Sequence, residues 1–212
     1  MRLRRVKNAQ NILESTDFVI QNPKKHKNKF WELFGNKNPI HVEIGMGKGQ
    51  FLLKMALKFP DINFVGIEKS DSILVRAVEK ISEHEIKNIR IICIDASEIV
   101  EVFGKEVSNI YLNFSDPWPK ARHFKRRLTS SIFLELYEQI LINERTITQK
   151  TDNVILFESS IESFAENNWQ LLAMDRDLAN SEIDTETTEY EDKFRSLGQS
   201  IYYIKVTKGE NL

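Results

Sequence analysis

Three glycines at alternate positions, Gly45, Gly47 and Gly49, separate an apolar run from the start of a helical pattern. Glycines in such a turn permit a tight bend and let a ligand lie against the backbone. The spacing G-x-G-x-G is one residue shorter than the dinucleotide fingerprint G-x-G-x-x-G, which disfavours a nicotinamide-dependent oxidoreductase. Glu43, two residues before the first glycine, suits a cationic or hydroxyl-rich ligand better than a pyrophosphate. Taken alone, the glycines are also compatible with a purely structural turn.

Two further acids end the next two apolar runs. Glu68 follows Gly49 by 19 residues, the position from which an acid binds the two ribose hydroxyls of an adenosine ligand. Asp95 ends the third run and would lie near an adenine edge. Because the carboxyl ends of parallel strands meet at one edge of a sheet, Glu43, Glu68 and Asp95 predict a nucleoside site at that edge.

A fourth apolar run leads into Ser115-Asp116-Pro117-Trp118-Pro119-Lys120. The two prolines stiffen this loop and hold Asp116 beside the sheet. Trp118 is of a residue type that stacks on nucleic-acid bases. A rigid structural turn is the alternative interpretation of this loop.

A basic run follows this loop at once and is suited to phosphate contacts. Its members are Arg122, His123, Phe124, Lys125, Arg126 and Arg127. A second basic segment covers residues 1–29, with eight basic and two acidic side chains. For this segment, a solvated tail is as good an interpretation as a binding site for a polyanion. The chain as a whole holds 30 Lys and Arg against 31 Asp and Glu. The balanced total therefore conceals two basic segments, and a polyanionic partner is indicated.

The elements that must position these residues are short apolar runs alternating with helical patterns. Strands are predicted over 40–45, 62–67, 89–94, 109–114, 146–151, 169–174 and 201–206. Helices are predicted over 49–58, 71–84, 96–103, 129–142, 155–167 and 188–197. Nearly all-apolar strands separated by helices indicate an α/β fold with a mostly parallel sheet covered on both faces, and the last two strands form an antiparallel pair. We divide the 212 residues into a basic N-terminal extension, 1–38, and a single domain, 39–212. In the extension, Phe30-Trp31-Leu33-Phe34 are predicted to pack in the core.

Several classes of protein are disfavoured by composition. The single cysteine, Cys93, excludes an internal disulfide framework and a Cys-rich zinc site, and its apolar surroundings predict a buried, inert thiol. The four histidines show no metal-ligand spacing, so no metal is expected. No apolar run has the roughly 18–20 residues of a membrane span, and polar residues stand where a signal peptide would be apolar. The expected location is the cytoplasm, with no membrane partner.

The glycine loop and its acids resemble those of class I S-adenosylmethionine-dependent methyltransferases, whose Rossmann-like fold has a seven-stranded sheet with a C-terminal antiparallel hairpin. The resemblance narrows to the bacterial tRNA (guanine-N7-)-methyltransferases. The matching segments are VEIGMGKGQF (42–51), GIE (66–68), SDPWPK (115–120), RHFKRRL (122–128), KTDN (150–153), LFE (156–158) and TEYEDKF (188–194).

This resemblance implies an enzyme that methylates N7 of guanosine 46 in the variable loop of tRNA, with S-adenosyl-L-methionine as cofactor. Its cofactor contacts are Glu43, Gly45, Gly47, Gly49, Glu68, Asp95 and Asp116, and Asp116 is also the catalytic residue. Its substrate contacts are Lys120, Asp152, Thr188, Glu189, Tyr190 and Glu191, and residues 122–127 bind RNA. The expected state is a monomer or a homodimer. The sequence departs from the family at Asn143-Glu144-Arg145, where paired glycines are usual, and at Val154-Ile155, where Arg-Gly is usual.

Guanine N7 carries a lone pair and no proton, so direct methyl displacement needs no general base, and alignment and electrostatics remain as the protein's work. Asp116 would stabilise the positive charge that develops on guanine, or orient the base through its N1–H and N2–H₂ edge. Two other functions are compatible with the fold. One is methylation of an exocyclic amine, although such enzymes usually carry Asn-Pro-Pro-aromatic after the fourth strand. The other is a non-catalytic RNA-binding protein.

Overall fold

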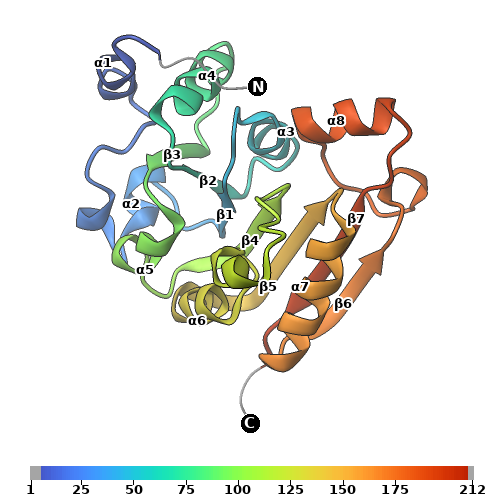
Figure 1. Cartoon of the computed structure of the whole chain (residues 1–212). Helices are drawn as coiled ribbons and strands as arrows, with labels where there is room; N and C mark the ends of the chain where they lie inside the picture. The colour runs from blue at the N-terminus through green and yellow to red at the C-terminus, as the bar shows by residue number, and fades with distance from the viewer. Residues whose placement is uncertain (1–5, 210–212) are drawn as a thin grey trace.

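A seven-stranded sheet with helices on both faces forms the domain (Figure 1). The computed structural model describes residues 6–209, without the side chains of residues 143 and 144. Its strands are β1 (Ile40–Ile44), β2 (Asn63–Glu68), β3 (Ile89–Cys93), β4 (Val107–Asn113), β5 (Leu141–Thr151), β6 (Gln170–Asp175) and β7 (Tyr202–Thr207). Its α-helices are α1 (Ala9–Glu14), α2 (Phe30–Phe34), α3 (Gln50–Lys58), α4 (Asp71–Ser82), α5 (Ile99–Val102), α6 (Ser131–Ile140), α7 (Val154–Glu166) and α8 (Glu189–Ser196). Its 3₁₀ turns are η1 (Pro23–His26), η2 (Ala96–Glu98), η3 (Ala121–Arg126) and η4 (Leu178–Asn180).

The strand order is β3-β2-β1-β4-β5-β7-β6. Strands β1 to β5 pair in parallel, and β7 lies antiparallel to both β5 and β6. The predicted fold class and the antiparallel C-terminal pair are confirmed. The chain winds outward from β1 to β3 and then returns to β4 on the other side of β1. Ligands of open α/β sheets bind beside such a switch point, outside the carboxyl ends of the strands.

Successive apolar residues of the parallel strands pack on opposite faces of the sheet. In β2, Phe64 joins the cluster formed with α1, α3 and α4, whereas Val65 joins the cluster formed with α2, α5, α6 and α7. In β3, Ile91 and Ile92 divide in the same way. Because both faces are covered, β1, β2 and β3 are mostly apolar along their length, which is the pattern that the sequence shows. The strand β5 is also buried but carries polar side chains, among them Thr148, Gln149 and Lys150.

Some predicted boundaries were wrong by a few residues. The helix predicted over 96–103 is a 3₁₀ turn followed by one turn of α-helix, and β5 begins at Leu141, directly after α6. Arg145 has a φ of 45°, so a left-handed residue stands in the segment 143–145, where the resemblance leads us to expect paired glycines. A non-glycine residue in that region bends the strand entry at some steric cost.

Of the predicted basic extension, residues 1–5 lie outside the described residues, and residues from the remainder pack against the rest of the chain. Val19 forms a parallel bridge with Ile91 at the free edge of β3. Phe30 is fully buried and packs against Phe103, with ring centroids 4.4 Å apart and the rings tilted by 34°, which confirms its core role. Trp31 differs from that prediction, because its side chain is exposed.

The prediction of a buried Cys93 was wrong. Cys93 is the last residue of β3 and is exposed, because it stands where the strand emerges from between its covering helices. Partial burial of the sulfur, with Asp71 and Glu68 nearby, raises the pKa of the Cys93 thiol. The thiol therefore remains protonated at neutral pH.

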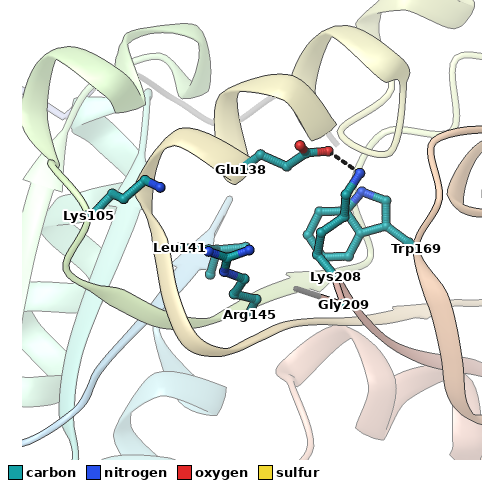
Figure 2. Close-up of a pocket in the computed structure, with 7 residues that line it drawn as sticks. All are labelled: Lys105, Glu138, Leu141, Arg145, Trp169, Lys208 and Gly209. Carbon is teal, nitrogen blue, oxygen red and sulfur yellow. Dashed lines mark hydrogen bonds and ion pairs between the residues drawn. The ribbon is translucent and has the colours of Figure 1, made fainter. Parts of the chain in front are cut away.

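A cavity of about 380 Å³ opens at the amino-terminal edge of the sheet, where β5 begins and β7 ends (Figure 2). Lys208 crosses it to form an ion pair with Glu138 at 2.6 Å, beside the Trp169 ring. The predicted site residues lie at the opposite edge. Among residues 6–209, no helix is long and apolar enough to span a membrane.

Candidate cofactor and RNA site

Glu43, Glu68 and Asp95 stand at or just beyond the carboxyl ends of β1, β2 and β3, as predicted. The Glu68 carboxylate binds backbone N–H groups of two loops. Its Oε2 accepts from the N–H of Gly47 at 3.3 Å, and its Oε1 accepts from the N–H of Ser70 at 3.0 Å. One carboxylate thus links the glycine loop to the turn after β2.

The glycine loop divides into an open part and a packed part. Gly45, Gly47 and Gly49 all have left-handed backbones, with φ of 76°, 56° and 78°. Nothing lies within 4 Å of the positions that a Cβ would occupy on Gly45 and Gly47. On Gly49, a Cβ would lie 3.0 Å from Met46 Cε and 3.2 Å from Ala77 Cβ. The first two glycines therefore border free space, and the third closes the packing between α3 and α4.

Glu43 is buried, with 1% of its surface exposed. Its Oε1 accepts from Asn113 Nδ2 at 2.8 Å, and its Oε2 receives no hydrogen bond from the residues that the structure describes. Burial raises the pKa of Glu43 to about 8, and the negative charges of Glu189 and Glu68 act in the same direction. Asn113 and Lys150 oppose the rise. A buried carboxyl with one unpartnered oxygen is ready to receive a cationic or hydrogen-bond-donating ligand.

Asp95 is exposed and caps the turn that follows it. Its Oδ1 accepts from the backbone N–H of Ser97 at 3.0 Å and from its hydroxyl at 2.7 Å. These bonds hold the pKa of Asp95 below its usual range, so the residue is a carboxylate at neutral pH.

The loop carrying Asp116 begins and ends in unusual backbone conformations. Phe114 has a φ of 51° and Trp118 a φ of 40°. The N–H of Phe114 donates to the Lys150 carbonyl at 2.8 Å, so the loop leaves the sheet directly beside the end of β5. The side chain of Asp116 is exposed at this edge.

The structure brings Tyr190 and Asp152 to this loop. The Tyr190 ring lies 5.0 Å from that of Phe114, and burial together with the charge of Asp152 raises the pKa of Tyr190. Thr188 caps α8 by accepting from the N–H of Glu191 at 2.9 Å. Tyr190 is 45% exposed, which leaves ring surface for a ligand.

Glu191 and Glu189 are held by protein cations. Glu191 is fully buried and forms ion pairs with Lys150 at 2.6 Å and Arg195 at 2.5 Å. Glu189 forms an ion pair with Lys80 on α4. Of the four residues 188–191, Glu191 is thus the one whose side chain is buried in the protein.

Sequence reasoning missed the residues that fasten α8 and the segment before it. Lys150 is fully buried and also donates to the carbonyl of Glu186 at 2.6 Å. On α3, Gln50 donates to Asp192 at 2.7 Å and Lys54 donates to Thr187 at 2.7 Å, so α3 and α8 lie side by side (Figure 1). In the sequence, Lys150 stands among the polar residues of the predicted strand 146–151 (TITQKT), so no local pattern marks it as buried.

The basic run forms η3, beside the Asp116 loop. Lys120, Arg122, Lys125 and Arg126 are exposed, and Phe124 is 48% exposed. His123 and Arg127 are half-buried. At the start of α7, Val154 and Ile155 are exposed next to Asp152. These cations and apolar groups face solvent at the edge of the sheet that carries Glu43, Glu68 and Asp95, which we call the acidic rim. Such groups can contact the backbone and bases of a nucleic acid.

Comparison with known proteins places this arrangement in a family. The family model described as "Putative methyltransferase" matches residues 37–204. The tRNA (guanine-N(7)-)-methyltransferase of Lachnoclostridium phytofermentans is 47% identical over 207 residues, covering 96% of this chain and 97% of that protein. The enzyme of the same name from Bacillus subtilis is 48% identical over 209 residues, covering 97% and 98%. The chain belongs to this methyltransferase family.

Solved structures confirm the class I methyltransferase fold. The 16S rRNA methyltransferase KamB superposes with a TM-score of 0.64 at 15% identity, covering 86% of this chain and 93% of that one. The aminoglycoside resistance methyltransferase NpmB1 gives a TM-score of 0.60 at 13% identity, covering 86% and 93%. At these identities the likeness concerns the fold alone. Within the described residues, no cluster of three or more His, Cys, Asp or Glu could hold a metal ion.

Gly49→Ala should destabilise the enzyme more than Gly198→Ala does. Both glycines have left-handed backbones, with φ of 78° and 70°, but a Cβ on Gly198 meets nothing within 4 Å. The backbone change costs roughly 1–2 kcal/mol at either position. Crowding against Met46 and Ala77 adds roughly 1–3 kcal/mol at Gly49. Urea denaturation of both variants measures the difference, and equal losses would show that Met46 and Ala77 yield without cost.

Glu43 should make the stability of the enzyme depend on pH. The folded protein retains the Glu43 proton between the ordinary pKa of 4.5 and about 8, a range in which the unfolded chain has released it. The folded state therefore binds more protons there, and the free energy of unfolding falls as the pH rises through that window. Glu43→Gln removes this contribution, so the variant should gain stability relative to wild type between about pH 5 and about pH 8. Urea denaturation across that range gives the comparison, and parallel curves would contradict the burial argument.

Proposed function

We propose that this enzyme transfers the methyl group of S-adenosyl-L-methionine to N7 of guanosine 46 in the variable loop of tRNA. The observation that carries the proposal is the position of Asp116, on one edge of the sheet between the acidic rim and the exposed cations of η3. The names of the relatives supply the substrate class. Because tRNA is a cytoplasmic molecule in bacteria, we place the reaction in the cytoplasm.

The residues of the rim fit S-adenosyl-L-methionine. Space beside Gly45 and Gly47 admits a ligand against the backbone, and the Glu68 carboxylate suits the two ribose hydroxyls. The unpartnered oxygen of Glu43 suits the cationic amino group of the methionine part. When bound, the cofactor supplies a methyl group on a positively charged sulfur.

The residues of η3 and its surroundings fit tRNA. Lys120, Arg122 and Lys125 are exposed cations next to the Asp116 loop and suit phosphates of the RNA backbone. Tyr190, half-exposed and packed on Phe114, offers an aromatic surface for the target base beside Asp116. The guanine would thus be held between the Asp116 loop, which follows β4, and Tyr190 on α8.

No residue is required to remove a proton in this reaction, because guanine N7 has none. The protein's contribution is to align the base and to stabilise the positive charge that develops on the ring. Asp116 lies in the exposed loop that Phe114 begins, and Phe114 packs on Tyr190, where the base would stack. Its carboxylate acts as an electrostatic stabiliser and not as a general base.

The product of the wild-type enzyme tests the function directly. Unmodified tRNA incubated with labelled S-adenosyl-L-methionine should become labelled and should then break at position 46 after borohydride and aniline treatment, which is selective for 7-methylguanosine. A tRNA with adenosine at position 46 is the control and should stay unlabelled. Labelling without chain cleavage would identify an exocyclic amine as the target, and absence of labelling would favour the non-catalytic RNA-binding protein.

Asp116→Asn should lower the single-turnover methylation rate about 10²- to 10³-fold with both ligands saturating. The substitution keeps the shape of the side chain and removes its charge, and tRNA binding should be largely retained. Asp61→Asn makes the same change at an exposed position between α3 and β2, on the opposite edge of the sheet, and should leave the rate unchanged. A rate within about threefold of wild type for Asp116→Asn would reduce Asp116 to a turn residue.

A further inference from the structure

The guanidinium of Arg127 turns back onto the loop that carries Asp116. Its Nε donates to the carbonyl oxygen of Pro117 at 3.0 Å, and its Nη2 donates to that of Trp118 at 3.2 Å. Arg127 is half-buried, whereas Arg122 and Lys125 in the same run are exposed. Two of the five N–H donors of Arg127 are therefore committed to protein carbonyls.

The two carbonyls that Arg127 binds flank a strained residue. Trp118 has a φ of 40°, and a bulky residue keeps such a backbone only where its surroundings hold it. The indole is fixed as well: the Arg126 guanidinium lies 4.9 Å from its centre, and the His123 ring meets it edge-on at 5.7 Å. The residues of η3 and Arg127 thus fix both the backbone and the side chain of Trp118.

The path from Arg127 to Asp116 is short and stiff. Pro117 follows Asp116 directly, and its ring fixes its own φ. Because peptide units are planar, holding the Pro117 carbonyl leaves few free rotations between the guanidinium and the Asp116 carboxylate. A lysine could reach one of the two carbonyls, but its single ammonium lacks the planar fork that reaches both.

We propose that Arg127 is a positioning residue, which fixes the Asp116 loop through the Pro117 and Trp118 carbonyls and does not bind RNA phosphate. This inference rests on the proposed function, because it assigns Arg127 a role through Asp116. It also divides the basic run in two: Arg122 and Lys125 face the RNA, and Arg127 faces the loop that acts on the guanine. Arg127, directly after η3, thereby joins the segment that binds RNA to the loop that carries Asp116.

The first test needs neither cofactor nor tRNA. The chain has three tryptophans, Trp31, Trp118 and Trp169, so enzyme labelled with 5-fluorotryptophan gives three fluorine resonances, which single Trp→Phe variants assign. Arg127→Ala should shift or broaden the Trp118 resonance and leave those of Trp31 and Trp169 in place, since Arg127 holds the Trp118 backbone. Lys125→Ala, a matched change in the same run, should leave the Trp118 resonance unmoved. An unmoved Trp118 resonance in Arg127→Ala overturns the proposal.

The second test separates positioning from phosphate binding. With tRNA and S-adenosyl-L-methionine saturating, Arg127→Ala should lower the single-turnover rate roughly 10²-fold, as misplaced catalytic groups do. The slope of log affinity for tRNA against log salt concentration should stay that of wild type. Lys125→Ala should instead lower this slope by about 0.7–0.9, the value for one lost phosphate contact.

Arg127→Lys keeps the positive charge and loses the fork, so it should be as slow as Arg127→Ala. A wild-type rate in Arg127→Lys, or a lowered salt slope with a retained rate in Arg127→Ala, would make Arg127 a phosphate contact. If Arg127→Ala does not fold, the Trp31 and Trp169 resonances collapse, and Arg127→Lys then decides. If the wild-type enzyme does not methylate tRNA, the proposed function fails, while the fluorine experiment still tests whether Arg127 holds the loop.

Discussion

The ion pair between Lys150 and Glu191 is the contact on which the assembled site depends. Both side chains are fully buried, and they join the end of β5 to the first turn of α8. A buried pair of this kind adds little net stability over apolar packing, but removing one partner leaves an uncompensated charge and is costly. The ion pair contributes here by fixing the positions of the elements that it joins. It fixes Tyr190 next to Phe114, and the Lys150 carbonyl in turn receives the N–H that begins the Asp116 loop.

Charge divides the same edge of the sheet into two regions. The acids of β1, β2 and β3 form one region, and the cations around η3 form the other, with Asp116 between them. The acidic region is suited to a cationic cofactor, and the basic one to a polyanion. Burying an acid in this region has a cost, which is visible in the raised pKa of Glu43, and the nearby negative charges of Glu189 and Glu68 add to it. A positively charged ligand would relieve that cost, so binding and protonation of Glu43 are linked.

Rigidity is concentrated where the chemistry requires alignment. Phe114 and Trp118, on either side of Asp116, have backbones that cost roughly 1–3 kcal/mol each and persist only when neighbouring groups hold them. The neighbours come from β5, α8 and η3. Methyl transfer to a lone pair depends on alignment more than on proton transfer. A stiff loop that fixes Asp116 therefore contributes to catalysis by holding the reacting groups in position.

The sequence by itself determined the sheet, its parallel strands, and the position of the acids and glycines at strand ends. These features follow from local patterns, because apolar runs, turn glycines and strand ends are defined by residues close together in the chain. Only the tertiary structure decided the environments of individual side chains. Glu191 is buried because Lys150, 41 residues earlier, meets it inside the protein, and Arg127 faces inward because the Trp118 backbone turns toward it. Cys93 is exposed because its strand ends at the rim. A basic run or a helix start has the same appearance in a sequence whether its side chains face a ligand or the protein, since burial depends on the packing of distant elements.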